Sequence, residues 1–226
     1  LIDLDDLAQN QYIVTQQFIY RAGATERRAD LVMLVNGLPL VLIEAKTPVK
    51  KCISWVDGAI QVHDDYEKFV PELFVCNVFS VATEGKAFRY GSIGLPVKDW
   101  GPWHLDGDGD DSQHHPLKSL KLSAESMLRP HVVLDILGSF TLFATDKKAR
   151  RKKVICRYQQ YEAANKIVER VLAGYPKKGL IWHFQGSGKS LLMLYAAKML
   201  RSDNTLKNPT VLIVVDRRDL DTQISE

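Results

Sequence analysis

The chain has 226 residues and a formal net charge of +3 at pH 7, with 46% hydrophobic and 25% charged residues. This composition is ordinary for a globular protein, and no apolar run reaches the roughly 18 residues that a membrane span needs. The small net charge means that any basic surface for nucleic acid has to be local. Three scattered cysteines, Cys52, Cys76 and Cys156, favour reduced thiols in a cytoplasmic protein over disulfides or a zinc site.

The first predicted strand covers residues 12–20, and a charged loop with Arg27 and Arg28 follows it. These two arginines are either contacts to a DNA phosphate or solvated side chains. Next come two apolar runs, residues 31–35 and 40–43, on either side of Asn36-Gly37. This dipeptide between apolar runs predicts a β-hairpin.

Three charged residues stand at the open end of this hairpin: Asp30, Glu44 and Lys46. Charges beside apolar runs are costly to bury, so their presence asks for a reason. Two carboxylates and a lysine can hold a divalent metal and hydrolyse a phosphodiester. The spacing alone is equally compatible with a surface hairpin that has charged ends.

The register of the hairpin decides whether these side chains can meet. Glu44 shares a face with the lysine two residues later, because side chains alternate along a strand. A two-residue loop would put Asp30 opposite Ile43 and leave Glu44 on the other face. A three-residue loop with a bulge at Gly37 would put Asp30 opposite Leu42, diagonal to Glu44. The metal-site hypothesis therefore predicts the bulged turn.

Further elements complete an α/β layer with a mixed sheet flanked by helices. The pattern predicts a helix, a buried strand, a short strand, a helix interrupted near Pro130 and a last strand, at residues 57–69, 73–82, 87–90, 123–138 and 140–143. The acidic loop of residues 106–115 lacks the glycine and glutamate spacing of an EF-hand and the spacing of a zinc site. We expect it to be a solvated loop.

A basic stretch separates two predicted domains. Six of the seven residues from Lys147 to Lys153 are Lys or Arg. We expect residues 147–156 to be a linker, either solvated or in contact with a DNA backbone. The domains would then be residues 1–146 and 157–226.

The second domain carries a phosphate-binding loop. A predicted buried strand, residues 179–184, runs into Gln185-Gly-Ser-Gly-Lys-Ser190 and then a helix at 191–200. Strand, glycine-rich turn, Lys-Ser and helix form the P-loop arrangement for ATP with Mg²⁺. Its glycines allow backbone N–H groups to reach phosphate oxygens, the lysine neutralises phosphate charge, and the serine hydroxyl ligates Mg²⁺. The phosphate-binding residues are Gly186, Ser187, Gly188, Lys189 and Ser190. A second buried strand is predicted at 210–215.

Asp30-x13-Glu44-x-Lys46 on a hairpin is the PD-(D/E)xK nuclease pattern. The strings N-G-L-P-L-V-L-I-E-A-K-T-P, G-L-I-W-H-F-Q-G-S-G-K-S and V-V-D-R-R-D-L-D-T-Q extend the likeness over nearly the whole chain. The chain resembles the restriction (motor) subunit of type I restriction–modification enzymes. The resemblance implies a PD-(D/E)xK nuclease domain followed by the beginning of a RecA-like motor of the superfamily 2 helicase type.

The resemblance also implies roles for individual residues. Asp30 and Glu44 would hold Mg²⁺ together with the Ala45 carbonyl, and Lys46 would position the attacking water. Gln61 would complete the catalytic set. The family has a tyrosine four residues after this glutamine, whereas Tyr66 stands five residues after it here.

In the motor, Gln159 would read the adenine edge, with Gln160 as the alternative. Arg217 and Arg218 would contact the DNA backbone. The implied partners are double-stranded DNA and the methyltransferase and specificity subunits of the complex. No later motor motif follows, so we expect a piece of a longer protein that binds ATP without hydrolysing it. Two other functions stay open: a nuclease-like domain that only docks partners, and an ATP-dependent repair nuclease–helicase.

Overall fold

The computed structural model describes residues 1–49, 52–104, 116–145 and 149–214. The chain divides into two compact units, Leu1–Ile155 and Cys156–Glu226. The loop at 106–115 and the arginines at 217 and 218 lie outside the described residues. None of the helices described is long and apolar enough to cross a membrane.

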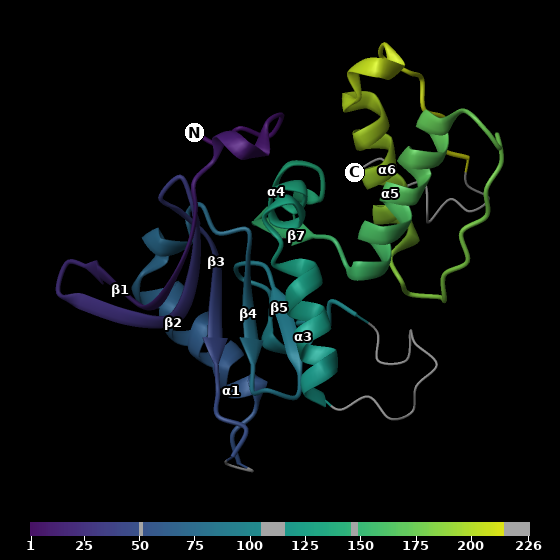
Figure 1. Ribbon diagram of the computed structural model, residues 1–226. Coiled ribbons are helices and arrows are strands. Elements are labelled where there is room, and N and C mark those ends of the chain that lie inside the picture. The colour runs from purple at the N-terminus through teal and green to yellow at the C-terminus, as the bar shows by residue number, and fades with distance from the viewer. Residues whose placement is uncertain (50–51, 105–115, 146–148, 215–226) are drawn as a thin grey trace. The chain divides into compact units, whose positions relative to one another are not determined.

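A five-stranded sheet forms the centre of the first unit (Figure 1). Its strands lie in chain order and are β1 (Tyr12–Ala22), β2 (Thr25–Val35), β3 (Leu38–Ala45), β4 (Phe79–Thr83) and β5 (Phe88–Gly91). β3 and β4 pair in parallel and every other pair is antiparallel. The predicted mixed sheet is confirmed. A long connection that contains helices joins the two parallel strands, as parallel pairing requires.

That connection packs a helical segment against the sheet. α1 (Trp55–Ile60) begins at a capping box, in which the Ser54 and Asp57 side chains each bond the other's backbone N–H. It continues through a π-helical segment, Gln61–Tyr66, into α2 (Glu67–Phe69). α1 contacts β3 and β4. The buried Ala59 and Val62 on this segment join Val32 and Leu42 of the sheet in one hydrophobic cluster.

Two predicted elements of this unit differ from the observed ones. The strand expected at 73–82 is wrong in its first half, because Pro71–Phe74 forms a 3-10 turn and the strand starts only at Phe79. Proline at the first position fixes the helical φ angle that such a turn needs. Proline also starts a new helix at Pro130, so the interrupted helix is two helices, α3 (Pro116–Met127) and α4 (Pro130–Gly138).

The predicted linker is wrong for residues 151–155. Its residues Arg151–Ile155 form β7, which pairs with β6 (Thr141–Thr145) in a two-stranded antiparallel ribbon. The basic side chains fit because a ribbon leaves much of its surface in solvent, and Arg151 lies over the Phe143 ring at 5.1 Å. Lys153 is partly buried here and donates to the Asn77 carbonyl, while burial lowers its pKa.

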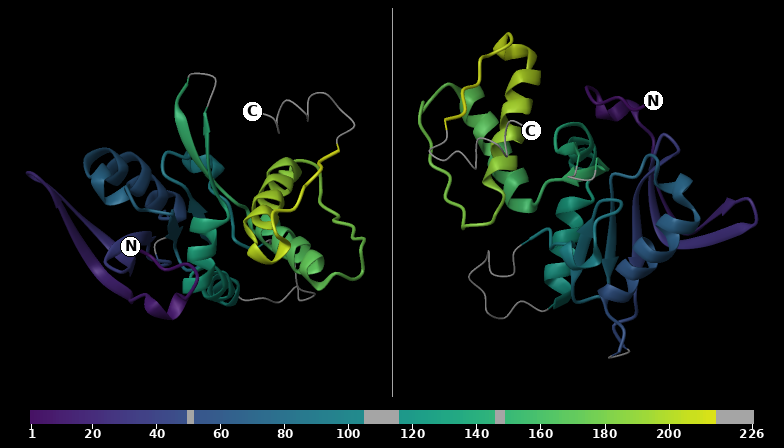
Figure 2. Two further views of the ribbon diagram at one scale, coloured as in Figure 1. Left: turned by 90° about the horizontal axis from the view of Figure 1, so that it is seen from above. Right: turned by 180° about the vertical axis from the view of Figure 1, so that it is seen from behind.

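The described part of the second unit has two α-helices, a 3-10 turn at Asn204–Leu206 and their connecting segments (Figure 2). α5 (Tyr158–Ala173) ends at Gly174, whose left-handed conformation terminates the helix. α6 (Lys189–Ser202) contacts α5, and the buried side chains of this unit include Ala163, Ala164, Leu192, Tyr195 and Ala196.

Both predicted strands of the second unit are wrong for the described residues. Residues 179–184 and 210–214 are extended but unpaired segments, with Trp182 89% and Leu212 83% exposed. A parallel strand needs neighbours on its edges, and the described part of this unit contains no strand to supply them. An apolar run alone therefore did not produce a strand.

Candidate active site

The β2–β3 hairpin brings Asp30 and Glu44 together, by a different device from the one predicted. Its turn is the simple two-residue loop at Asn36-Gly37, with Val35 paired to Leu38. Both turn residues have positive φ, +50° and +81°, as a tight hairpin turn demands. The prediction of a three-residue loop with a bulge at Gly37 is therefore wrong.

A bulge in β3, just beyond the turn, shifts the register so that Asp30 and Glu44 can meet. Leu34 pairs with Pro39 and Met33 pairs with Val41, which leaves Leu40 as the extra residue. The shift makes Leu31 the partner of Ile43, and one step on it brings Asp30 across from Glu44. Pro39 beside the bulge has no N–H to offer the ladder, so the irregularity falls where a hydrogen bond is already missing.

The Asp30 carboxylate is held from two neighbouring strands. The Ala45 backbone N–H donates to Oδ2 at 2.9 Å, and the Gln17 side-chain amide donates to Oδ1 at 3.1 Å. The two oxygens are therefore fixed in orientation by neutral donors. A carboxylate so held keeps lone pairs for a cation.

Glu44 is the buried member of the pair, with only 2% of its surface exposed. Gly58 of α1 lies against it, and a Cβ there would make an ordinary contact of 3.6 Å with the Glu44 Cβ. Burial raises the pKa of Glu44, Lys46 opposes that rise and the nearby Asp30 adds to it. The Lys46 ammonium lies 3.0 Å from Glu44 Oε1, so the buried carboxylate has a cationic partner.

Gln61 and Tyr66 meet because the helix between them is π-helical. Residues five apart share a face in a π turn, as residues four apart do in an α-helix. Gln61 accepts a hydrogen bond from Lys46 Nζ and donates to the Tyr66 hydroxyl. Tyr66 in turn donates to the Arg28 carbonyl at 2.7 Å and lies 3.5 Å from Glu44 Oε2.

The sequence left the role of Tyr66 open, because its spacing from Gln61 is one residue longer than in the resembled family. The π turn absorbs that extra residue, and Tyr66 is buried beside the carboxylates. Burial and the Glu44 charge raise the pKa of the Tyr66 hydroxyl, which keeps it a neutral donor. A spacing of five residues brings the tyrosine beside Gln61 only where a π turn lies between them.

One of the two arginines considered as phosphate contacts has a structural partner. Both donor branches of Arg27 bind the Asp65 carboxylate, at 2.6 and 2.7 Å, and its guanidinium lies over the Phe69 ring. This bidentate pair ties β2 to the helical segment.

The donor set fits Mg²⁺ and not a structural zinc ion. It offers two carboxylates and backbone carbonyls, all oxygen ligands, and Mg²⁺ is commonly held by one or two carboxylates with water in the remaining positions. Among the described residues no group of three or more His, Cys, Asp or Glu side chains could hold a metal. A soft or tetrahedral site is therefore not formed by the residues described here.

The phosphate-binding loop of the second unit has the conformation that its glycines allow. Gly186 and Gly188 have φ of +83° and +80°, and α6 starts at Lys189. The Lys189 ammonium donates to the Phe184 carbonyl at 3.0 Å and lies 3.2 Å from that of His183. Ser187 is buried and Ser190 follows in the first turn of the helix, whose N-terminus favours an anion.

The glutamine at this loop is Gln160, the alternative to the predicted Gln159. Its amide donates to the carbonyls of Ser187 and Gly188, and its oxygen accepts from the Arg157 N–H. Gln160 is 2% exposed. Gln160 lies on the buried side of α5, and the preceding residue, Gln159, points in a different direction from the helix.

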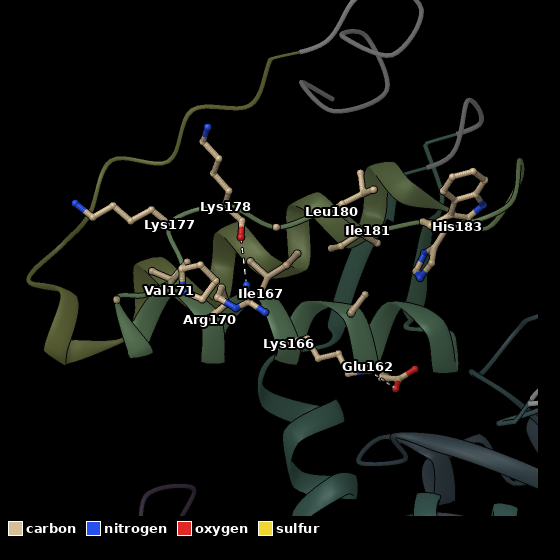
Figure 3. A pocket seen from close by; sticks show the side chains of 15 residues that line it. Glu162, Lys166, Ile167, Arg170, Val171, Lys177, Lys178, Leu180, Ile181 and His183 are labelled. Carbon is tan, nitrogen blue, oxygen red and sulfur yellow. Dashed lines mark hydrogen bonds and ion pairs between the residues drawn. The ribbon is translucent and has the colours of Figure 1, made fainter.

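A hollow of about 870 Å³ lies between α5 and the extended segment before the P-loop (Figure 3). Ile167 and Val171 of α5 line it, together with Ile181 from the facing segment. Arg170 donates to the Lys178 carbonyl across it at 3.2 Å. The lining residues lie between 162 and 183, upstream of the phosphate-binding loop, so this hollow is not the predicted nucleotide site.

Comparison with known proteins matches both units. Residues 1–94 match the family described as type I restriction enzyme R protein N terminus, and residues 159–226 match the SWI2/SNF2 ATPase family. The chain carries the N-terminal domain of the R proteins of type I restriction enzymes. The first match covers Asp30, Glu44, Lys46 and Gln61, and the second covers the phosphate-binding loop.

Individual relatives of this family align along the full chain. The type I restriction enzyme HindI endonuclease subunit of Haemophilus influenzae is 31% identical over 231 residues, 99% of this chain and 22% of that protein. The putative type I restriction enzyme MjaVIIIP endonuclease subunit of Methanocaldococcus jannaschii is 30% identical over 235 residues, 100% of this chain and 22% of that protein. The chain therefore spans about a fifth of the length of these relatives.

Proposed function

We propose that this R protein segment contains the DNA-cleaving centre of a type I restriction enzyme, a Mg²⁺-dependent endonuclease of the PD-(D/E)xK class. The supporting observation is one connected cluster: Asp30 and Glu44 face each other, and Lys46 bridges Glu44 to Gln61. The names of the relatives, endonuclease subunits of type I restriction enzymes, agree with this function.

Each residue of the cluster has a defined task. Asp30 and Glu44 would hold Mg²⁺ with the Ala45 carbonyl, and the bound ion supplies Lewis acidity toward a phosphate oxygen. Lys46 orients the attacking water and offsets negative charge that develops on the phosphate. Gln61 fixes the Lys46 ammonium, and Tyr66 fixes Gln61, so the lysine is oriented before the substrate arrives.

The phosphate-binding loop would supply the ATP-driven side of the same protein. Gly186, Ser187, Gly188 and Lys189 would cradle the phosphates of ATP, and the Ser190 hydroxyl would ligate the Mg²⁺ of the nucleotide. Gln160 supports this role by bonding two carbonyls of the loop, and Gln159 would remain the adenine contact, because the Gln160 amide is already hydrogen-bonded at both ends. The whole protein would translocate double-stranded DNA with methyltransferase and specificity subunits as partners.

Cleavage of DNA by the intact complex tests the proposal. Glu44→Gln and Lys46→Met are expected to lower the cleavage rate by at least about a hundredfold, because each removes charge from the reacting centre. ATP-dependent activity of the complex should be retained, since the nucleotide loop belongs to the other unit. Glu26→Gln, which changes an exposed carboxylate on the β1–β2 hairpin, is the matched control and should cleave normally.

Undiminished cleavage by Glu44→Gln would contradict the proposal. If the wild-type complex shows no metal-dependent cleavage of DNA, the docking role is favoured, in which the nuclease-like fold only binds partner subunits.

A further inference from the structure

Gln17 has an unusual backbone conformation at the point of β1 that faces the active site. The β1–β2 ladder pairs Gln16 with Leu31 and Phe18 with Ala29, so Asp30 is the position across from Gln17. Gln17 has φ of +52°, in the left-handed region that residues other than glycine rarely enter. This strained residue lies in the middle of an eleven-residue strand, where no turn requires it.

The sheet changes face at the same place. Ala29 and Val32 are three residues apart and would lie on opposite faces of a regular strand. Both are buried in the same hydrophobic cluster. The ladder is therefore irregular around Asp30, and Gln17 is the irregular residue of the partner strand.

Packing does not account for the strain at Gln17, because its side chain is exposed. The described contact of that side chain is the hydrogen bond from its amide to Asp30 Oδ1 at 3.1 Å. Backbone strain that surrounding contacts maintain is common where a fold fixes a functional group. An amide suits this task, since it fixes a carboxylate without the positive charge that would compete with a cation.

We infer that Gln17 is a positioning residue for Asp30, which holds the carboxylate in its metal-binding orientation before Mg²⁺ arrives. The inference rests on the proposed role of Asp30 as a metal ligand. The Ala45 N–H fixes one carboxylate oxygen and Gln17 fixes the other. Loss of one of the two hydrogen bonds lets the Asp30 side chain change rotamer. Metal binding must then pay the entropic cost of ordering that side chain, so the affinity for Mg²⁺ falls.

Gln17→Gly separates positioning from a merely structural role. Glycine accepts the left-handed backbone without strain but lacks the amide. In the intact protein without nucleotide, the Mg²⁺ dissociation constant measured by calorimetry should rise about three- to tenfold, the value of one lost hydrogen bond. The Mg²⁺ concentration for half-maximal DNA cleavage should rise by the same factor, with the rate at saturating Mg²⁺ nearly unchanged. The melting temperature should stay equal or rise.

Gln16→Gly is the matched control, because Gln16 is an exposed neighbour with a regular ladder partner. Glycine in a regular strand should lower the melting temperature and leave the Mg²⁺ dissociation constant unchanged. An unchanged Mg²⁺ dissociation constant in Gln17→Gly would overturn the positioning role. If Asp30→Asn binds Mg²⁺ as the wild type does, the proposed metal site itself fails, and the inference with it.

Discussion

The two candidate sites of this chain are built in opposite ways. The hairpin site draws its residues from β1, β2, β3 and the π-helical segment, and its central carboxylate, Glu44, is 2% exposed. The phosphate-binding loop is shaped by two left-handed glycines and the start of one helix, while the neighbouring Trp182 is 89% exposed. A site made of local conformation forms without a sheet, whereas a site of buried charges needs the whole fold around it.

The largest effect that distinguishes the two sites is expected for Gly188→Ala. A Cβ there would stand 2.2 Å from Gln160 Nε2, at a backbone φ of +80° that alanine avoids. We expect ATP affinity of the intact protein to fall about ten- to hundredfold, measured by nucleotide titration, because both strain and the lost Gln160 contact distort the loop.

The control for that change is Gly179→Ala, where a Cβ would meet no heavy atom within 4 Å. It should bind ATP as the wild type does. Mg²⁺ binding at the hairpin should be unaffected by either change, and a joint loss would mean that the two sites are not independent.

The next effect concerns the stability of the sheet that carries the hairpin site. A Cβ at Gly91 would lie 2.5 Å from Trp100 Nε1, and that indole is held by its hydrogen bond to the Leu95 carbonyl. Gly91→Ala should lower the free energy of unfolding of the first unit by about 1–3 kcal/mol in denaturant titration. Gly101→Ala, with no heavy atom within 4 Å of the new Cβ, should have little effect. Equal stability of the two variants would show that the indole moves aside.

A smaller effect concerns the stability cost of burying Glu44. Because burial raises the pKa of Glu44, the folded state favours its protonated form. The stability that protonated Glu44 contributes is fully present below its pKa in the unfolded chain, about 4.5. It is lost as the pH rises through the higher pKa of Glu44 in the folded protein. In metal-free buffer, the unfolding free energy of Glu44→Gln relative to wild type should therefore increase with pH across that interval. A pH-independent difference would mean that Lys46 fully compensates the burial.

The smallest effect is expected for deletion of Asp64, an exposed residue within the π turn. The deletion restores four-residue spacing between Gln61 and Tyr66, which an ordinary α-helix brings to one face. Cleavage should persist, and the free energy of unfolding should change by less than about 1 kcal/mol. Loss of cleavage with an intact fold would contradict the claim that the π turn only compensates for an extra residue.

Much of the hairpin site could be predicted from the sequence. Asn36-Gly37 located the hairpin, although the predicted turn type was wrong, and the charges at its open end drew attention to Asp30, Glu44 and Lys46. The bulge could not be located, because Leu40 differs from its neighbours only in how the ladder pairs. Gln17 carried no local signal, since its role follows from lying across β1 from Asp30.

The second unit shows the converse limit. The phosphate-binding loop and α6 follow from local residue types, glycine at left-handed positions and helix formers after Lys189. The apolar runs at 179–184 and 210–214 are typical of buried strands, yet a strand also needs partners, and the described residues provide none. The basic residues at 147–153 suggested a linker, although pairing with β6 makes residues 151–155 a strand.

The central claim is that the two carboxylates of the hairpin bind Mg²⁺, and a melting curve with and without this ion tests it most directly. A ligand that binds only the folded state raises its melting temperature. Without nucleotide, Mg²⁺ should raise the melting temperature of the wild type but not that of an Asp30→Asn/Glu44→Gln double variant. A wild type that Mg²⁺ does not stabilise, or a double variant stabilised equally, would contradict a metal site at the hairpin.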